Sequence, residues 1–300
     1  MKETTLQFYK ERMLRVLVHI QQRLDDPLPL SELAGLACLS PCHFHRVFTG
    51  MIGESVKEHI RRLRLERAAN RLKLGDAFVI QIALEAGYES HEAFTRAFRR
   101  NFGASPTEYR RRKRLPGWIR AASGIHYHQH HRLVRFRATA PEENSMKLAI
   151  KHIKPLRVAF VRHAGPYCQV GKAWETLCMF LGKEGRLGGD CQFIGLSHDD
   201  PEVTPPDKIR YDACITVSDD FHARGDIGVQ VIGGRDYAAM THFGPYEKLN
   251  ESYAKLLGLW LPRSGRELNG GPSLEFYLNS PENTAPEDLI TDICAPLESK

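Results

Sequence analysis

Apolar residues recur at three- and four-residue steps through the first third of the chain, which is the spacing of one face of an α-helix. Residues 5–24 show this pattern first, and Asp25-Asp26-Pro27 ends it. Ser-x-x-Glu at Ser55 and at Ser105 is the capping-box pattern that begins a helix. The spacing predicts further helices over residues 31–37, 40–53, 55–74, 80–87 and 90–102, and from 105 through 109. This region is therefore predicted to be all α-helical.

Two stretches of the helical region share one layout at an offset of fifty residues, from Arg46 to Arg96. Residues 33–53 and 82–103 each contain an apolar residue followed by Ala, a capping Ser, two Phe that flank an Arg, and a closing Gly. A short helix, a turn and a second helix form the helix-turn-helix pattern, whose second helix enters the DNA major groove. A single pair also fits an ordinary helical hairpin, but the duplication favours two recognition helices in successive grooves.

Charge is distributed unevenly along the chain. Residues 1–114 hold 21 Lys and Arg against 13 Asp and Glu, whereas the remaining residues hold 21 against 23. The first region therefore carries +8 and the second −2, within a total of +6. A basic first third predicts an anionic partner, such as double-stranded DNA, for that region only.

From Met146 the pattern changes to short β-strands interrupted by two helices. Strands are predicted over residues 158–163, 193–196, 211–217, 237–242 and 274–279, and helices over 168–182 and 247–260. A Gly-Pro-Tyr turn at Gly165 returns at Gly244, 79 residues later (244 − 165). The repeat predicts two pseudo-symmetric halves, each a helix on a small antiparallel sheet, with a groove between them. The expected fold class is multidomain: an all-α domain followed by a duplicated α+β domain.

Several classes of protein are not expected from the composition. Seven Cys, an odd number without any Cys-x-x-Cys, predict free thiols in a reducing compartment. The chain has no apolar run of membrane-spanning length and no signal-peptide pattern at its start, so we expect a cytoplasmic protein. No nucleophile elbow, metal-ligand cluster or phosphate-binding loop is present, so no cofactor, metal or enzymatic activity is expected.

The chain divides into a helical domain over residues 5–113, a linker over 114–145 and a second domain over 146–298. The linker contains alternating histidines at His126, His128, His130 and His131. Such a tract can bind a metal, but no carboxylate or thiol stands beside it. We therefore expect a solvated linker.

The second helix-turn-helix carries a longer pattern: Ile82-Ala83, Gly87-Tyr88, Ser90, Phe94, Arg96, Phe98, Gly103, Ser105-Pro106 and Tyr109-Arg110. With this pattern, residues 5–113 resemble the DNA-binding domain of AraC/XylS-type transcription regulators. The resemblance implies two helix-turn-helix subdomains that read an asymmetric DNA site, with RNA polymerase as a candidate second partner. By position, it implies base-facing side chains at Cys42, His45 and Arg46 in the first unit and at His91, Glu92, Thr95 and Arg96 in the second.

The chemistry of these side chains suits base recognition to different degrees. Arg binds guanine O6 and N7 with two hydrogen bonds, Glu accepts from cytosine N4, and Thr contacts the thymine methyl group. Cys42 and His45 are weak base readers. Arg99, Arg100 and the arginines of the helix over residues 55–74 are expected to meet phosphates, which position the protein without specifying sequence.

The second half carries a family pattern of its own: the two Gly-Pro-Tyr turns, residues 199–206 with 210–214, and residues 274–278 followed by Pro281. With it, residues 147–298 resemble the GyrI-like effector-binding domain. The resemblance implies a cleft with aromatic side chains and a glutamate that binds small, often cationic compounds. A carboxylate beside aromatic rings suits a lipophilic cation, so Glu275 is the first candidate. The further candidates are Tyr277, Trp174, Tyr167, Tyr246 and Tyr253.

Three functions remain open at this point. The first is a transcription regulator whose second domain binds a small effector. The second is a regulator fused to a GyrI-like hydrolase, since some such domains activate water with the cleft glutamate, a role open to Glu275 with Tyr277. The third is a second domain that binds a protein partner instead of a small molecule.

Overall fold

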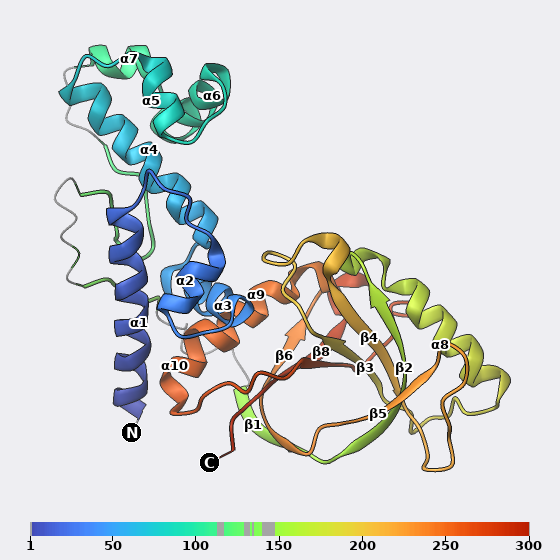
Figure 1. Ribbon diagram of the computed structural model, residues 1–300. Coiled ribbons are helices and arrows are strands. Elements are labelled where there is room, and N and C mark those ends of the chain that lie inside the picture. The colour runs from blue at the N-terminus through green and yellow to red at the C-terminus, as the bar shows by residue number, and fades with distance from the viewer. Residues whose placement is uncertain (1, 113–116, 129–132, 134, 140–147, 300) are drawn as a thin grey trace. The chain divides into compact units, whose positions relative to one another are not determined.

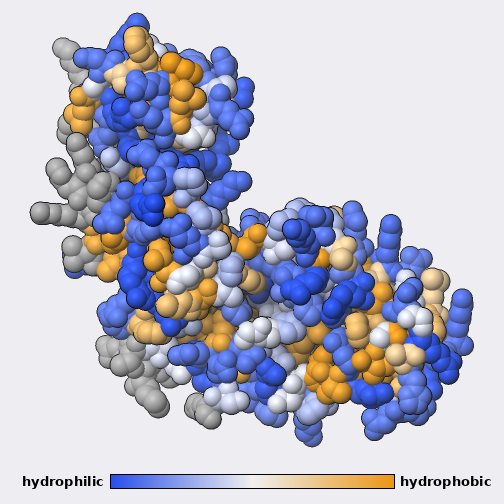
Figure 2. All heavy atoms as spheres, in the orientation of Figure 1, coloured by the Kyte–Doolittle hydropathy of each residue, from blue (hydrophilic) through white to orange (hydrophobic). Residues whose placement is uncertain are grey.

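The computed structural model describes residues 2–112, 117–128, 133, 135–139 and 148–299. Its internal contacts divide the chain into two units, residues 6–140 and residues 141–300 together with 1–5. The first is called the helical unit and the second the sheet unit (Figure 1). On the visible face, hydrophilic side chains cover most of each unit. Apolar side chains appear there as separate patches among the hydrophilic ones (Figure 2).

The helical unit has the helices that the apolar spacing predicts. They are α1 (Lys2–Gln22), α2 (Leu30–Leu36), α3 (Pro41–Ile52), α4 (Val56–Leu74), α5 (Val79–Glu85), α6 (His91–Phe102) and α7 (Pro106–Arg111). Both predicted capping boxes form, because Ser55 and Ser105 each exchange hydrogen bonds with the Glu three residues later. Gly53 and Gly103 end α3 and α6 with φ of 82° and 68°, a left-handed conformation that glycine adopts without steric cost.

Each helix-turn-helix has a small aromatic core, and α4 joins the two. The first core contains Phe44 and Phe48, whose ring centroids lie 5.7 Å apart. The second contains Phe94, Phe98 and Tyr109, with Phe98 5.4 Å from Phe94 and 5.2 Å from Tyr109 between ring centroids. Such ring pairs contribute packing beyond simple apolar burial. The two cores fix how each recognition helix is presented.

The described residues that follow α7 pack against the helical unit, so the predicted solvated linker is corrected for them. Ile125 is 2% exposed and Tyr127 9% exposed. Further along, the backbone N–H of Thr139 donates to the carbonyl of Met51 over 2.9 Å. The physical cause is the buried carboxylate of Glu66, which accepts hydrogen bonds from the backbone of Ile119 and Tyr127. An unpaired buried carboxylate is costly, so it orders the segment that satisfies it.

The sheet unit is built on one antiparallel sheet that curls strongly (Figure 1). Its strands are β1 (Leu148–Ile153), β2 (Leu156–Ala164), β3 (Phe193–Ser197), β4 (Arg210–Thr216), β5 (Gly228–Ile232), β6 (Arg235–Phe243), β7 (Ser273–Tyr277) and β8 (Ile290–Pro296). They lie in the order β1-β6-β8-β7-β3-β4-β2-β5. The order is symmetric about the β7–β3 pair, which confirms the predicted duplication. β1, β5 and β8 were not predicted from the sequence.

Helices cover one face of the sheet, and the curl encloses a core on the other. The helices are α8 (Gly171–Lys183) and α9 (Leu249–Ala254), the latter continued by a π-helical turn (Lys255–Trp260) and α10 (Leu261–Ser264). Leu177 of α8 packs against Tyr211 and Ala213 of β4. Residues of opposite parity, such as Cys214 and Leu274, belong to the enclosed core. This alternation is the period of two expected for strands.

Candidate DNA-reading helices and effector site

The first recognition helix, α3, begins as predicted. The Ser40 hydroxyl accepts from the backbone N–H of His43 over 3.4 Å, and Pro41 holds the first helical position. Cys42 is half-buried, and His45 and Arg46 are each 9% exposed. A base contact by His45 or Arg46 would therefore require its side chain to become more accessible.

The second recognition helix, α6, presents a polar face of the predicted residues. Its apolar stripe is inward, with Phe94 and Phe98 fully buried. Five of the predicted contacts, His91, Glu92, Arg96, Arg99 and Arg100, are exposed, and the sixth, Thr95, is half-buried.

Two local contacts affect how these residues could act. The backbone N–H of Glu92 and the Ser90 hydroxyl lower the pKa of Glu92, so the carboxylate is an acceptor at neutral pH. Arg99 lies 3.8 Å from a carboxylate oxygen of Glu108.

The arginines of α4 mostly serve the fold, which corrects their expected role as phosphate contacts. Arg62 donates to the carboxylates of Glu54 and Glu66. Arg64 donates to the carbonyls of Leu24 and Asp26. Arg67 bonds Asp25 and the carbonyl of Glu85, and Arg71 pairs with the Glu85 side chain. Arg61 is exposed, and a phosphate contact by Arg61 stays a prediction.

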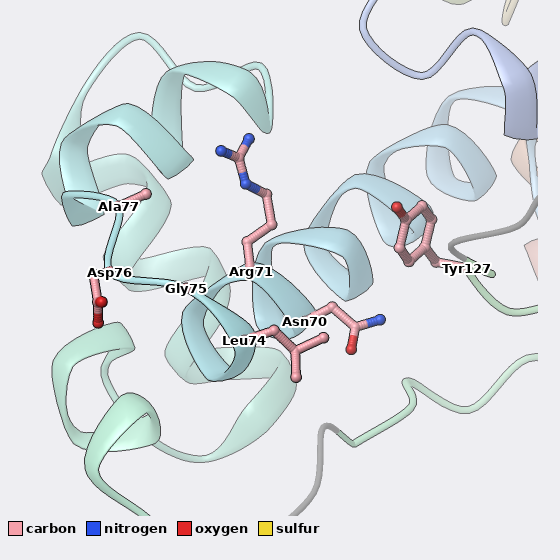
Figure 3. Close-up of a pocket in the computed structure, with 7 residues that line it drawn as sticks. All are labelled: Asn70, Arg71, Leu74, Gly75, Asp76, Ala77 and Tyr127. Carbon is pink, nitrogen blue, oxygen red and sulfur yellow. The ribbon is translucent and has the colours of Figure 1, made fainter.

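A hollow of about 290 Å³ lies where α4 ends, close to Tyr127 (Figure 3). Its lining mixes polar and apolar side chains from Asn70 to Ala77. Arg71, which lines it, is already paired with Glu85. None of the predicted base-reading or effector-binding residues contributes to this hollow, and we assign it no function.

The six predicted effector residues gather on the helix-covered face of the sheet. Glu275 of β7 is 6% exposed. Its Oε1 accepts the hydroxyl of Tyr253 from α9 over 3.0 Å, and its Oε2 accepts the hydroxyl of Tyr277 over 2.8 Å. The Tyr277 ring lies 5.7 Å from Trp174 of α8 and 5.3 Å from Tyr246, between ring centroids. The result is a buried carboxylate walled by aromatic rings.

Tyr211 completes this arrangement and was missed by the sequence reasoning. Its hydroxyl lies 2.9 Å from that of Tyr277, and it accepts the indole N–H of Trp174 over 3.1 Å. Its ring is 5.8 Å from that of Tyr167, whose hydroxyl donates to the carbonyl of Asp199. The sequence signal was its place on β4, where residues of odd number face the helices.

Burial governs the ionisation of the tyrosines in the candidate effector site. Burial, together with the negative charge of Glu275, raises the pKa of Tyr211 and of Tyr277 well above its ordinary value. The same two causes raise the pKa of Tyr246. All three hydroxyls therefore keep their protons at neutral pH and can donate hydrogen bonds towards the carboxylate side of the site.

Other predicted features of the chain have these outcomes. His126 bonds Glu66 over 3.1 Å, His128 is exposed, and His130 and His131 lie outside the described residues. Within the described part of the chain, no group of three or more His, Cys, Asp or Glu side chains could hold a metal ion. No helix there is long and apolar enough to cross a membrane. All seven cysteines are free thiols.

Comparisons with known proteins assign the family. Residues 146–298 match the GyrI-like small molecule binding domain, and residues 33–112 match a helix-turn-helix domain. Because the first match spans half of the chain, this protein belongs to the GyrI-like family, here joined to an AraC-type helix-turn-helix domain. Both resemblances stated from the sequence are thereby confirmed, as is the predicted fold class.

Particular relatives share parts of the chain. An uncharacterized HTH-type transcriptional regulator, YbfP of Bacillus subtilis strain 168, is 30% identical over 206 residues, 64% of this chain and 66% of that protein. The right origin-binding protein of Escherichia coli strain K12 is 36% identical over 110 residues, 37% of this chain and 36% of that protein, so the match spans about a third of its length. The crystal structure of the EcmrR C-terminal domain has a TM-score of 0.43 at 23% identity, covering 52% of this chain and 99% of that one.

Proposed function

We propose that this protein is a sequence-specific, DNA-binding transcription regulator whose sheet unit binds a small lipophilic cation at Glu275. The observation that carries the proposal is one chain that combines two helix-turn-helix units with a buried carboxylate walled by aromatic rings. The family membership and the relatives named as regulators support the DNA-binding part. The chemistry of the buried site supports the part that concerns the effector.

The proposed DNA contact centres on α6. Its exposed Arg96 can donate two hydrogen bonds to guanine, and the ionised Glu92 can accept from cytosine N4. Arg99 and Arg100 lie one turn further on, where phosphate contacts would set the register. The contribution of Cys42, His45 and Arg46 on α3 remains part of the proposal.

The proposed effector carries a positive charge among apolar groups. The carboxylate of Glu275 accepts two tyrosine hydroxyl hydrogen bonds, one on each oxygen. A cation near the carboxylate gains charge pairing, and the faces of Trp174, Tyr246 and Tyr277 add cation–π attraction. A neutral or anionic molecule of the same shape would lack both contributions.

We propose binding without turnover, in preference to the hydrolase alternative. A general base must hold the water that it activates within hydrogen-bond distance. At Glu275 the hydroxyls of Tyr253 and Tyr277 already occupy one acceptor position on each oxygen, which leaves fewer orientations for such a water. Incubating the protein with a bound lipophilic cation should therefore return it intact by mass spectrometry; cleavage abolished by Glu275→Gln would instead favour the hydrolase.

The DNA part is tested by selecting genomic fragments with the purified protein and titrating the best fragment by gel shift across salt. We expect one preferred site that spans two major grooves, and weaker, less selective binding by Arg96→Ala. Arg15→Ala is the matched control, because it removes an exposed positive charge from α1. Binding that is blind to sequence, with equal loss in both variants, would contradict the proposal.

The effector part is tested by calorimetry with tetraphenylphosphonium and its anionic isostere tetraphenylborate. We expect binding of the cation alone, and its loss in Glu275→Gln. Glu267→Gln, which removes an exposed carboxylate of the same unit, is the control and should bind normally. Equal binding of both ions would show that shape, and not charge, is recognised.

A further inference from the structure

The two halves of the repeat differ at the centre of the sheet. β3 and β7 are symmetry-related strands that pair with each other, and Gly195 of β3 lies directly opposite Glu275 of β7. The two residues are also equivalent in the repeat, at an offset of 80 (275 − 195), as Pro201 and Pro281 are. One half therefore places a carboxylate at the pseudo-two-fold axis, and the other half places no side chain there.

The space beside Gly195 is filled by two tyrosine hydroxyls. A Cβ atom at position 195 would lie 2.5 Å from the hydroxyl oxygen of Tyr211 and 2.7 Å from that of Tyr277. Both distances are well inside van der Waals contact. Glycine is thus required for the two hydroxyls to meet, and their 2.9 Å separation is a hydrogen bond.

This hydrogen bond is one of a series that links Trp174, Tyr211, Tyr277 and Glu275, and all of its donors point the same way. The indole of Trp174 can only donate, and it donates to Tyr211. An ionised carboxylate can only accept, and Glu275 accepts the proton of Tyr277. Each tyrosine has one proton, so the proton between them must come from Tyr211. Every donor in the series therefore points towards Glu275.

This series of hydrogen bonds also crosses from one half of the repeat to the other. Trp174 and Tyr211 belong to the first half, whereas Tyr277 and Glu275 belong to the second. The repeat-equivalents of Tyr211 and Tyr277 are Thr291 and Ser197, so the other half cannot build the same series. The two halves have diverged to supply one carboxylate and one line of donors to it.

We propose that Tyr211 is a positioning residue of the effector site, which acts on the bound cation through Tyr277 and depends on Gly195 for its place. This inference rests on the proposed cation-binding function. Tyr211 is 1% exposed, so it acts behind the wall of the site. The hydrogen bond from Tyr211 orients the hydroxyl of Tyr277, so that this hydroxyl donates to Glu275. It also holds the Tyr277 ring in place against Trp174 and Tyr246. Preorganisation of this kind lowers the ordering cost of binding.

A double-mutant cycle on tetraphenylphosphonium affinity tests the assignment. A single buried hydrogen bond is worth about 1 kcal/mol, so Tyr211→Phe and Tyr277→Phe should each weaken binding about fivefold. Because Tyr211 acts through the Tyr277 hydroxyl, the double variant should bind no more weakly than Tyr277→Phe alone. A role in packing alone would leave the affinity of Tyr211→Phe normal, because phenylalanine keeps the ring. Independent roles of the two hydroxyls would make the two losses multiply.

Two further variants sharpen the result. Gly195→Ala keeps every hydroxyl but forces those of Tyr211 and Tyr277 apart. It should therefore weaken cation binding at least as much as Tyr211→Phe does. Tyr237→Phe removes a buried tyrosine hydroxyl from the enclosed core and should leave the affinity unchanged. Normal affinity in Tyr211→Phe, or multiplying losses in the double variant, would overturn the inference while leaving cation binding intact. Failure of the wild-type protein to bind the cation would overturn the proposed function and this inference with it.

Discussion

At the residue scale, one backbone position differs between the two helix-turn-helix units. Cys38, in the turn after α2, has φ of 52°, the sole positive φ of a non-glycine among the described residues, whereas the equivalent Gly87 has φ of 80°. A side chain in this region costs about 1 kcal/mol, so Cys38→Gly should stabilise the protein by about 0.5–1 kcal/mol in urea unfolding. Cys38→Ser keeps the Cβ atom and should give no gain.

The opposite change in the second turn should destabilise the protein. A Cβ atom at Gly87 would lie 2.9 Å from a guanidinium nitrogen of Arg64, which is held by two backbone carbonyls. Gly87→Ala should therefore lower stability by more than 1 kcal/mol. Equal tolerance of Ala at position 87 and of Cys at position 38 would show that neither turn is strained.

A second residue-scale prediction concerns acid stability. Burial alone would raise the pKa of Glu54, but hydrogen bonds from His59 and Arg62 outweigh it and lower the pKa from 4.5 to about 2. A lowered pKa adds stability above the unfolded value of 4.5 and loses it as pH falls towards 2, in total about 3 kcal/mol. Glu54→Gln should therefore be destabilising at pH 7 and approach the wild type near pH 2.5, by urea unfolding. Glu89→Gln, which removes an exposed carboxylate of the same unit, is the control variant.

At the scale of elements, the sequence predicts segments with strong periodicity and misses those defined by their neighbours. The helices from α1 to α7 have regular apolar stripes, and α3, α4, α6 and α7 each begin at a capping serine. β1 is mostly exposed along its length, and β1 and β5 are edge strands, so neither shows clear alternation. The six residues predicted for the effector site lie together on one face of the sheet, while their role in binding stays a prediction. Tyr211 and Gly195 were not predicted, since their roles depend on the strand register, which sequence does not reveal.

The segment over residues 117–128 illustrates how one side chain can order an element. Its backbone is held by Glu66, by Arg62 on the carbonyl of Ile125, and by Gln21 on the carbonyl of His126. Removing the Glu66 carboxylate takes away one of the negative charges that pair with the buried Arg62 guanidinium. It also leaves the backbone N–H groups of Ile119 and Tyr127 without this acceptor. Glu66→Ala should cost about 3 kcal/mol and speed tryptic cleavage after the exposed Arg120. Unchanged cleavage there, beside normal cleavage in the control Glu11→Ala, would show that Glu66 does not hold the segment.

At the scale of the whole molecule, a regulator must couple its two ligands through free energy. If the cation changes the affinity for the selected DNA by some factor, the DNA must change the affinity for the cation by the same factor. Such coupling is usually about 5- to 150-fold, and it requires only that the cation bind two states of the protein unequally. We therefore expect DNA affinity, measured by fluorescence anisotropy with and without saturating tetraphenylphosphonium, to shift within this range. Calorimetry of the cation on the protein–DNA complex should give an equal shift. Glu275→Gln should bind DNA as the cation-free protein does and show no response, whereas Glu267→Gln should respond fully. A cation that binds at Glu275 and leaves DNA affinity unchanged would mean that the two units act independently, so that the sheet unit senses for some other output.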